Sequence, residues 1–120
     1  RCYPASSDPG SATSLGRALR AEIDASDEPV GVLVVADGMN TLTASAPGGH
    51  DPDSVAGQAA LDDALAAGDT AALAGLPDGV VGRVAFAVLA GLAGTGPAAT
   101  RELYRGAPYG VGYFVGVWQP

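Results

Sequence analysis

The run Val30–Ala36 (VGVLVVA) is the feature that most constrains the fold of this chain. It contains no polar residue and no alternation of apolar and polar positions, and Asp37-Gly38 follows it directly. A continuous apolar run of this kind predicts a central strand covered on both faces, as parallel sheets require. In an α/β sheet, ligands bind where strands end and loops begin. We therefore expect any site of this chain to lie around Asp37, Asn40 and His50.

The composition fits one domain or part of one. Of the 120 residues 48% are apolar, and 13 acidic residues against six basic ones give a net charge of −7. This charge argues against nucleic-acid partners and against anionic membrane surfaces. The single cysteine, Cys2, excludes an internal disulfide, so we expect an incidental thiol and a cytoplasmic protein. No signal peptide is visible, and the longest mostly apolar stretch, Val80–Ala93, is too short to span a bilayer.

The beginning of the chain is expected to be irregular over residues 1–12, and residues 13–120 to form the C-terminal part of a single α/β domain. The first residue is Arg1 rather than Met, which suggests that a preceding part was removed. A four-residue spacing of leucine and isoleucine predicts a helix over Thr13–Ala25, with Ser11 or Thr13 as its N-cap.

The remaining elements follow from periodicity and from capping residues. Asp53 or Ser54 is expected to start a helix that Gly68 ends, and Asp69 to cap the short turn after it. In chain order the sequence predicts a long loop over Asp37–Pro52, helices over Val55–Ala67 and Gly79–Ala93 separated by a short helical turn through Leu73, and β-prone runs at Thr100–Arg105 and Gly110–Trp118.

Three segments carry a resemblance to a known family. They are VLVVADG at Val32–Gly38 with its loop to APGG at Ala46–Gly49, DDALAAGDTAALAGL at Asp62–Leu76, and RGAPYGVGYFVGVW at Arg105–Trp118. Together they resemble the C-terminal half of a LigB-like protein of the class III extradiol ring-cleavage dioxygenase superfamily, closest to its short, Ala-rich actinobacterial members. The resemblance spans most of Ser14–Trp118. It implies part of a mostly parallel sheet flanked by helices and completed by another chain or by an N-terminal half.

Active members of that superfamily hold a ferrous ion with two histidines and a carboxylate, and a further histidine acts as acid and base. The metal histidines usually lie in the N-terminal half. The acid/base histidine usually ends a turn of the type small residue–Asp-x-Ser-His, and the matching stretch here is Ala36–Asn40 (ADGMN). Asn40 stands near the place of that histidine, and an amide does not shuttle protons near neutral pH.

Four residues are candidates for a pocket, and each has a structural alternative. His50, the only histidine, can bind a metal or act as a base oriented by Asp51 or Asp53, or it is a solvated loop residue. Asp37 either faces a cleft or belongs to an Asp-Gly turn in which Gly38 adopts positive φ. The other two candidates are Asn40 and Tyr109.

The aromatic cluster that contains Tyr109 and one pair of carboxylates also have structural interpretations. Tyr109 belongs to an aromatic cluster near the C-terminus that serves either core packing or ring stacking. Asp62 and Asp63 are adjacent on a helix, point about 100° apart, and are expected to be solvated.

Two functional hypotheses follow. In the first, the chain is a catalytically degenerate LigB-like half that binds a small molecule or serves as a structural half, without a cofactor. In the second, it is a subunit of a non-haem Fe(II) dioxygenase that cleaves catecholic rings, with its metal ligands in an N-terminal half. Under either, we expect the partner to be the N-terminal half of the same gene product as a separate chain, or a second copy.

Overall fold

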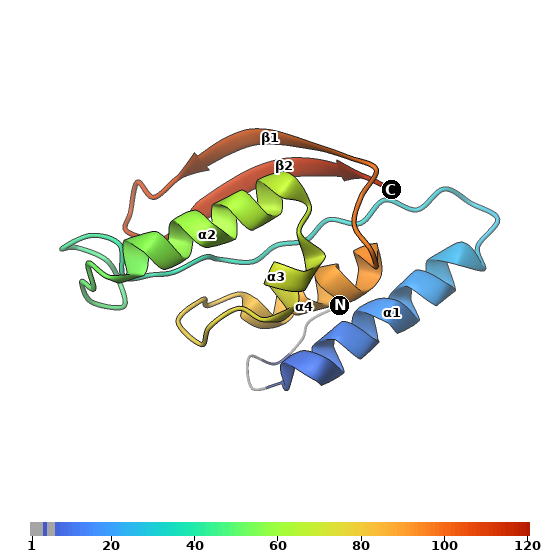
Figure 1. Cartoon of the computed structure of the whole chain (residues 1–120), viewed down its shortest axis with the longest axis horizontal. Coiled ribbons are helices and arrows are strands. Elements are labelled where there is room, and N and C mark those ends of the chain that lie inside the picture. The colour runs from blue at the N-terminus through green and yellow to red at the C-terminus, as the bar shows by residue number, and fades with distance from the viewer. Residues whose placement is uncertain (1–3, 5–6) are drawn as a thin grey trace.

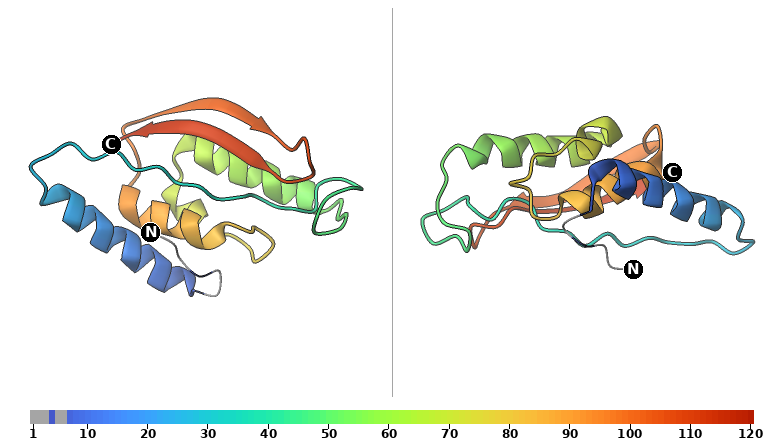
Figure 2. Two further views of the ribbon diagram at one scale, coloured as in Figure 1. Left: turned by 180° about the vertical axis from the view of Figure 1, so that it is seen from behind. Right: turned by 90° about the horizontal axis from the view of Figure 1, so that it is seen from below.

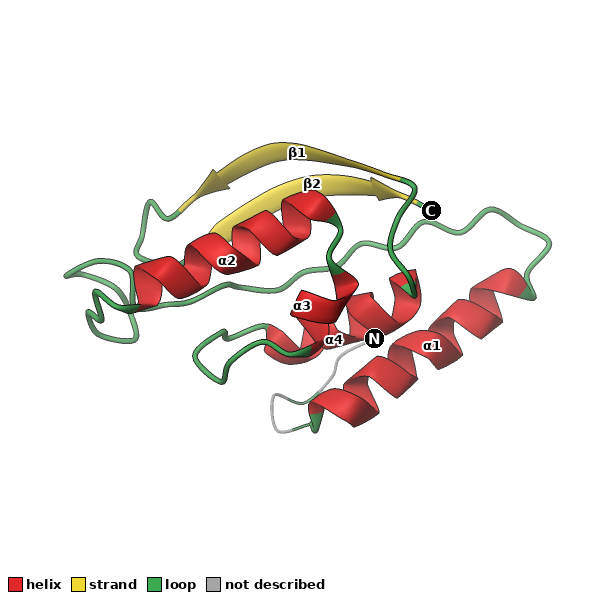
Figure 3. Ribbon diagram, viewed as in Figure 1, coloured by secondary structure: helices red, strands yellow, loops and turns green. Residues whose placement is uncertain are grey.

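The computed structural model describes Pro4 and residues 7–120, so Cys2 and part of the expected lead-in lie outside the described residues. Helices and one antiparallel hairpin make up the regular structure of this part of the chain (Figures 1 and 3). The α/β composition is confirmed, but a parallel sheet is not present among the described residues. The elements are α1 (Pro9–Asp24), α2 (Ser54–Ala67), α3 (Thr70–Ala74), α4 (Arg83–Ala93), β1 (Ala99–Gly106) and β2 (Tyr113–Gln119).

The largest departure from the sequence-based expectation is Val30–Ala36, which belongs to no sheet and crosses the molecule as a long loop (Figure 3). Among the described residues, none of its backbone N–H or C=O groups forms a hydrogen bond. Leu33 and Val35 are 87% and 82% exposed, whereas Val34 and Ala36 are half-buried. The prediction of a central strand covered on both faces is therefore wrong here, because no neighbouring strand pairs with this run. The alternating exposure nevertheless follows strand geometry.

The first helix starts earlier than predicted. Helix α1 begins at Pro9, and its N-cap is Asp8, whose carboxylate accepts a hydrogen bond from the Ser11 N–H at 3.1 Å. Proline suits the first turn of a helix because the missing N–H has no intrahelical acceptor there. The expected caps, Ser11 and Thr13, lie inside the helix instead.

Helices α1 and α4 pack side by side through glycine (Figure 1). A side chain on Gly16 would collide with the Val88 carbonyl, and one on Gly91 with the Thr13 carbonyl. Both glycines therefore allow the two backbones to approach more closely than larger residues permit.

Helix α4 starts later than predicted, at Arg83 rather than Gly79. The preceding residues are held in another conformation, because the N–H groups of Val81 and Gly82 donate to the carbonyls of Gly38 and Asp37 at 3.1 and 2.8 Å. An isolated bridge between Met39 and Val80 belongs to the same contact. The expected start of α2 is confirmed, as are the ends set by Gly68 (φ 71°) and the Asp69 cap of α3.

The hairpin of β1 and β2 packs against α2. Side chains from both strands reach that helix: the Trp118 indole N–H donates to the Leu65 carbonyl at 2.9 Å, and the Thr100 hydroxyl to the Ala66 carbonyl at 2.7 Å. The register shifts between Glu102 and Tyr104. Both predicted β-prone runs are confirmed as strands, although they pair antiparallel with each other.

The core lies between α2, α3, α4 and the hairpin, and a smaller cluster joins α1 to α4. Helices α2 and α3 lie on one side of the layer formed by the hairpin and Val30–Ala36 (Figure 2). In the part of the chain that the structure describes, no helix has the length and apolar character needed to cross a membrane. The main cluster of buried residues comprises Met39, Leu61, Ala64, Leu65, Leu73, Val80, Phe86 and Ala90.

Candidate functional site

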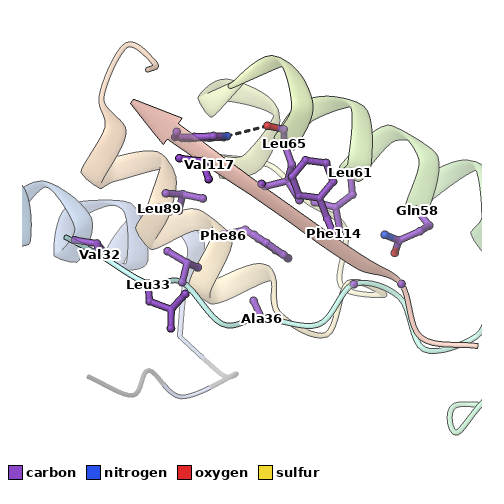
Figure 4. A pocket seen from close by; sticks show the side chains of 15 residues that line it. Val32, Leu33, Ala36, Gln58, Leu61, Leu65, Phe86, Leu89, Phe114 and Val117 are labelled. Atoms are coloured by element: carbon purple, nitrogen blue, oxygen red, sulfur yellow. Dashed lines mark hydrogen bonds between the residues drawn. The ribbon is translucent and has the colours of Figure 1, made fainter. Parts of the chain in front are cut away.

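An open cavity of about 360 Å³, here called the cleft, lies between Val30–Ala36 and β2. Its two long walls are extended backbone, and its floor consists of apolar side chains from α2 and α4. The walls separate toward Val32 on one side and Val117 on the other (Figure 4). The side chains that reach into it include Ala36, Leu61, Leu65, Phe86, Leu89, Phe114 and Trp118.

The cleft is closed at one end, where the two walls are hydrogen-bonded. The Gly38 N–H donates to the Gly112 carbonyl at 3.0 Å, and the Gly112 N–H donates to the Met39 carbonyl at 2.8 Å. Further from this end, β2 and Val30–Ala36 share no hydrogen bond among the described residues. The two segments thus form a V that is joined only at its apex.

Gln58 of α2 lies at this closed end and is the one polar side chain on the cleft lining. It is 7% exposed, and its Oε1 accepts from the Met39 N–H at 2.8 Å. A side chain on Gly38 or on Gly112 would collide with the Gln58 amide. Gly38 has no positive φ, so of the two interpretations of Asp37 the Asp-Gly turn with a left-handed Gly38 is wrong. Glycine is needed at this position for close approach to Gln58.

Asp62 continues this buried polar group. Its Oδ1 accepts from the Gln58 Nε2 at 2.9 Å, and the residue is 7% exposed. The prediction that Asp62 is solvated is therefore wrong, whereas it is confirmed for Asp63, which is exposed and binds Arg105 at 2.8 Å. Burial raises the pKa of Asp62, and the hydrogen bond from Gln58 and the charge of Arg105 partly oppose that rise.

Arg105 joins β1 to α2 at the surface. Its guanidinium contacts Glu102 at 2.8 Å and Asp63 at 2.8 Å. The hydrogen bond from Arg105 lowers the pKa of Glu102. This arrangement is a structural ion-pair network rather than part of the cleft, whose lining includes none of the three residues.

The four predicted site residues do not line the cleft. Asp37 is exposed and contacts Gly82 through its backbone carbonyl, while Asn40 is half-buried within the loop that follows. His50 is exposed in that loop, and Tyr109 is 73% exposed on the turn between β1 and β2. The structure therefore places the cleft beside Val30–Ala36 rather than in the loop after it.

Metal-ligating side chains do not gather in the described part of the chain. Within Pro4 and residues 7–120, no group of three or more His, Cys, Asp or Glu side chains has the arrangement of a metal site. His50 has neighbouring carboxylates in sequence at Asp51 and Asp53. Asp51 instead belongs to the turn that precedes α2, where its Oδ1 accepts from the Asp53 N–H at 3.0 Å.

Sequence reasoning missed Gln58 as a functional position. The available signal was a single amide on the otherwise apolar stretch SVAGQAAL that begins α2. A polar residue in such a place is buried only when it is hydrogen-bonded, as it is here. No family model, curated protein or solved structure matches this chain.

Proposed function

We propose that this chain is a non-catalytic, LigB-like half-domain whose sheet is completed by a second polypeptide into a mostly parallel arrangement. One observation carries the proposal: Val30–Ala36 is extended and apolar, yet its backbone is unpaired among the described residues. Exposed edges of this kind promote pairing with another chain. The N-terminal half of the same gene product is the proposed partner.

A partner is expected to bind this segment for an energetic reason, because large apolar side chains are exposed along it. Burying a leucine or valine side chain stabilises a structure by about 1.5–3 kcal/mol. Leu33 and Val35 are almost fully exposed, and Val115 and Val117 of β2 are also exposed. A partner that covers both the segment and the hairpin buries all four.

The non-catalytic part of the proposal depends on Asn40. In the family that the chain resembles, a histidine near this place exchanges protons with the substrate, which an amide cannot do near neutral pH. The side-chain amide of the half-buried Asn40 occupies the space that a side chain on Gly48 would need, and the Gly48 N–H donates to the Asn40 backbone carbonyl at 2.9 Å. This contact supports a structural role for the residue.

Native mass spectrometry of the product of the complete gene, beside its intact mass under denaturing conditions, tests the proposal. We expect the 11.7 kDa chain to be bound to one different polypeptide, with no stoichiometric iron. A homodimer would show that the partner is a second copy of this chain rather than a different polypeptide. A monodisperse monomer, or stoichiometric iron in the assembled protein, would contradict the proposal.

A further inference from the structure

From the shape of the cleft we infer where the partner binds: it inserts an extended β-strand between Val30–Ala36 and β2, pairing with the backbone of both. This inference rests on the proposed function and specifies the docking site. The alternatives are addition at the outer edge of β1 and binding of a small molecule in the cleft.

The walls of the cleft are what identify a polypeptide strand as the occupant. Val30–Ala36 runs toward the closed end and β2 runs away from it, so an inserted strand is parallel to one wall and antiparallel to the other (Figures 1 and 4). The wall formed by Val30–Ala36 has unpaired N–H and C=O groups among the described residues. Only another backbone offers donors and acceptors in the matching repeat of a strand.

The floor of the cleft determines which kind of side chain the occupant can direct toward it. It is apolar apart from Gln58, whose amide already accepts from Met39 and donates to Asp62. Because alternate side chains of a strand face the same side, every second residue of the inserted strand faces this floor. Those residues are therefore apolar.

A second copy of this chain does not offer such a strand. Apart from the edge of β2 that faces the cleft, the free edge of the hairpin is that of β1, and this strand carries Arg101, Glu102 and Arg105. Charged residues of this kind protect edges from pairing and do not suit an apolar cleft. The other extended segment, Val30–Ala36, is fixed at its end by hydrogen bonds within its own chain. The Asp37 carbonyl accepts from the Gly82 N–H, and the Gly38 N–H donates to the Gly112 carbonyl. The occupant is thus an apolar strand of a different polypeptide.

The backbone at the closed end shows which amides face the cleft. Asp37 directs its carbonyl to Gly82, and Gly38 directs its N–H to Gly112 across the apex of the V. Successive residues of an extended chain direct these groups to opposite edges. The N–H of Val34 therefore faces the cleft, and the N–H of Val35 faces the opposite edge.

Two synthetic peptides test the inference. The probe is a strand-forming peptide of about ten residues, alternating valine and threonine with a lysine at each end. The control has the same side chains with alternate backbone amides methylated, so that it cannot pair along one edge. Trp118, the only tryptophan, lines the cleft and reports insertion through a blue shift of its emission. We expect the shift with the probe and not with the control.

Proline variants locate the paired edge. Proline removes an N–H, so Val34→Pro should weaken probe binding by about tenfold or more, while Val35→Pro should leave it nearly unchanged. The opposite pattern would place the partner on the other edge and overturn the inference. Circular dichroism checks that both variants fold, and the methylated peptide provides a comparison on the unchanged protein.

The remaining outcomes also decide the question. Equal binding of the methylated peptide would show that the cleft binds apolar ligands without backbone pairing. Binding of neither peptide would show that the cleft is not a strand site. Either result overturns the inference. Concentration-dependent self-association that shifts Trp118 emission would show that a second copy occupies the cleft, and this result would also overturn the inference. The proposed function fails separately, when the complete gene product contains no companion polypeptide.

Discussion

At the residue scale, the amide of Gln58 connects three parts of the chain. It accepts from the Met39 N–H in the loop, donates to Asp62 on its own helix, and contacts the glycine backbones at Gly38 and Gly112. These contacts fix the closed end of the cleft. A buried amide with both ends satisfied specifies one arrangement of its neighbours, since any other arrangement leaves a polar atom unpaired.

Replacing Gln58 with leucine tests this role. Gln58→Leu leaves the Met39 N–H and the Asp62 carboxylate without their partner, so we expect a loss of about 2–4 kcal/mol in the free energy of unfolding. Urea denaturation measures it. The control is Gln119→Leu at the exposed end of β2, which should change stability by less than about 0.5 kcal/mol. Equal stability of the two variants would show that the Gln58 bonds do not hold the loop.

Asp62 gives a prediction with a definite pH dependence. Burial raises the pKa of Asp62 above the value of 3.8 that applies in the unfolded state. The carboxyl group therefore binds its proton more tightly in the folded state than in the unfolded state. The contribution of Asp62 to stability is therefore fully present below that pH and is lost as the pH rises through the raised value. Asp62→Asn removes this loss and keeps an oxygen for the Gln58 amide.

We expect the stability of Asp62→Asn relative to the parent to increase between acidic and neutral pH. Thermal melts across that range measure the difference, and Asp63→Asn, at the exposed neighbour that binds Arg105, is the control without this increase. A difference that stays constant with pH, or one that falls, would show that the Asp62 carboxylate is not penalised by burial.

At this scale the sequence predicted the candidate positions poorly. The loop residues Asp37, Asn40 and His50 attract attention because polar residues after an apolar run often form sites. The cleft instead depends on Gln58 and on the space that Gly38 and Gly112 leave for it, which is a tertiary contact. Such contacts join distant segments, and no local pattern encodes them.

At the scale of elements, local signals predicted most of the helices and strands. The Asp69 cap and the left-handed Gly68 were recognisable because aspartate is a favoured N-cap residue and glycine the favoured left-handed residue after a helix. The starts of α1 and α4 were not. Asp8 and Ser11 are both good caps, and residues before Arg83 bond to Asp37 and Gly38 rather than continuing the helix.

The glycine contact between α1 and α4 gives the prediction at this scale. Gly91→Ala places a methyl group against the Thr13 carbonyl, so we expect a loss of about 1–3 kcal/mol despite the higher helix propensity of alanine. Chemical denaturation measures it. Gly31→Ala is the control, because no atom lies within 4 Å of the added carbon. An unchanged stability for Gly91→Ala would contradict the close packing of these helices.

At the scale of the whole molecule, the described chain consists of helices, a two-stranded antiparallel sheet and one extended segment without a pairing strand. The hairpin of β1 and β2 and the unpaired Val30–Ala36 lie in one layer, and the cleft separates them. The sequence predicted a paired central strand at Val30–Ala36, whereas the structure has an extended segment there that pairs with no strand. Propensity is a property of the segment, whereas pairing depends on which other strands are present.

A functional prediction belongs to this scale as well. Under the proposed LigB-like identity, the chain alone should not cleave catecholic rings, because His50 is its only imidazole and the resemblance aligns Asn40 with the acid/base histidine. Incubation with ferrous ion, dioxygen and a set of catechols, followed by absorbance, measures the activity. Appearance of a yellow ring-opened product would contradict the non-catalytic assignment.

Hydrogen–deuterium exchange over Val30–Ala36 is the most direct test of the central claim, that this segment is an unpaired strand reserved for a partner. In the isolated, monodisperse chain we expect its amides to exchange at nearly the rate of an unstructured peptide, while the paired amides of β1 and β2 are protected. In the assembled gene product we expect the amides that face the cleft, including that of Val34, to become protected. Protection of Val30–Ala36 already present in the isolated monomer would contradict the claim.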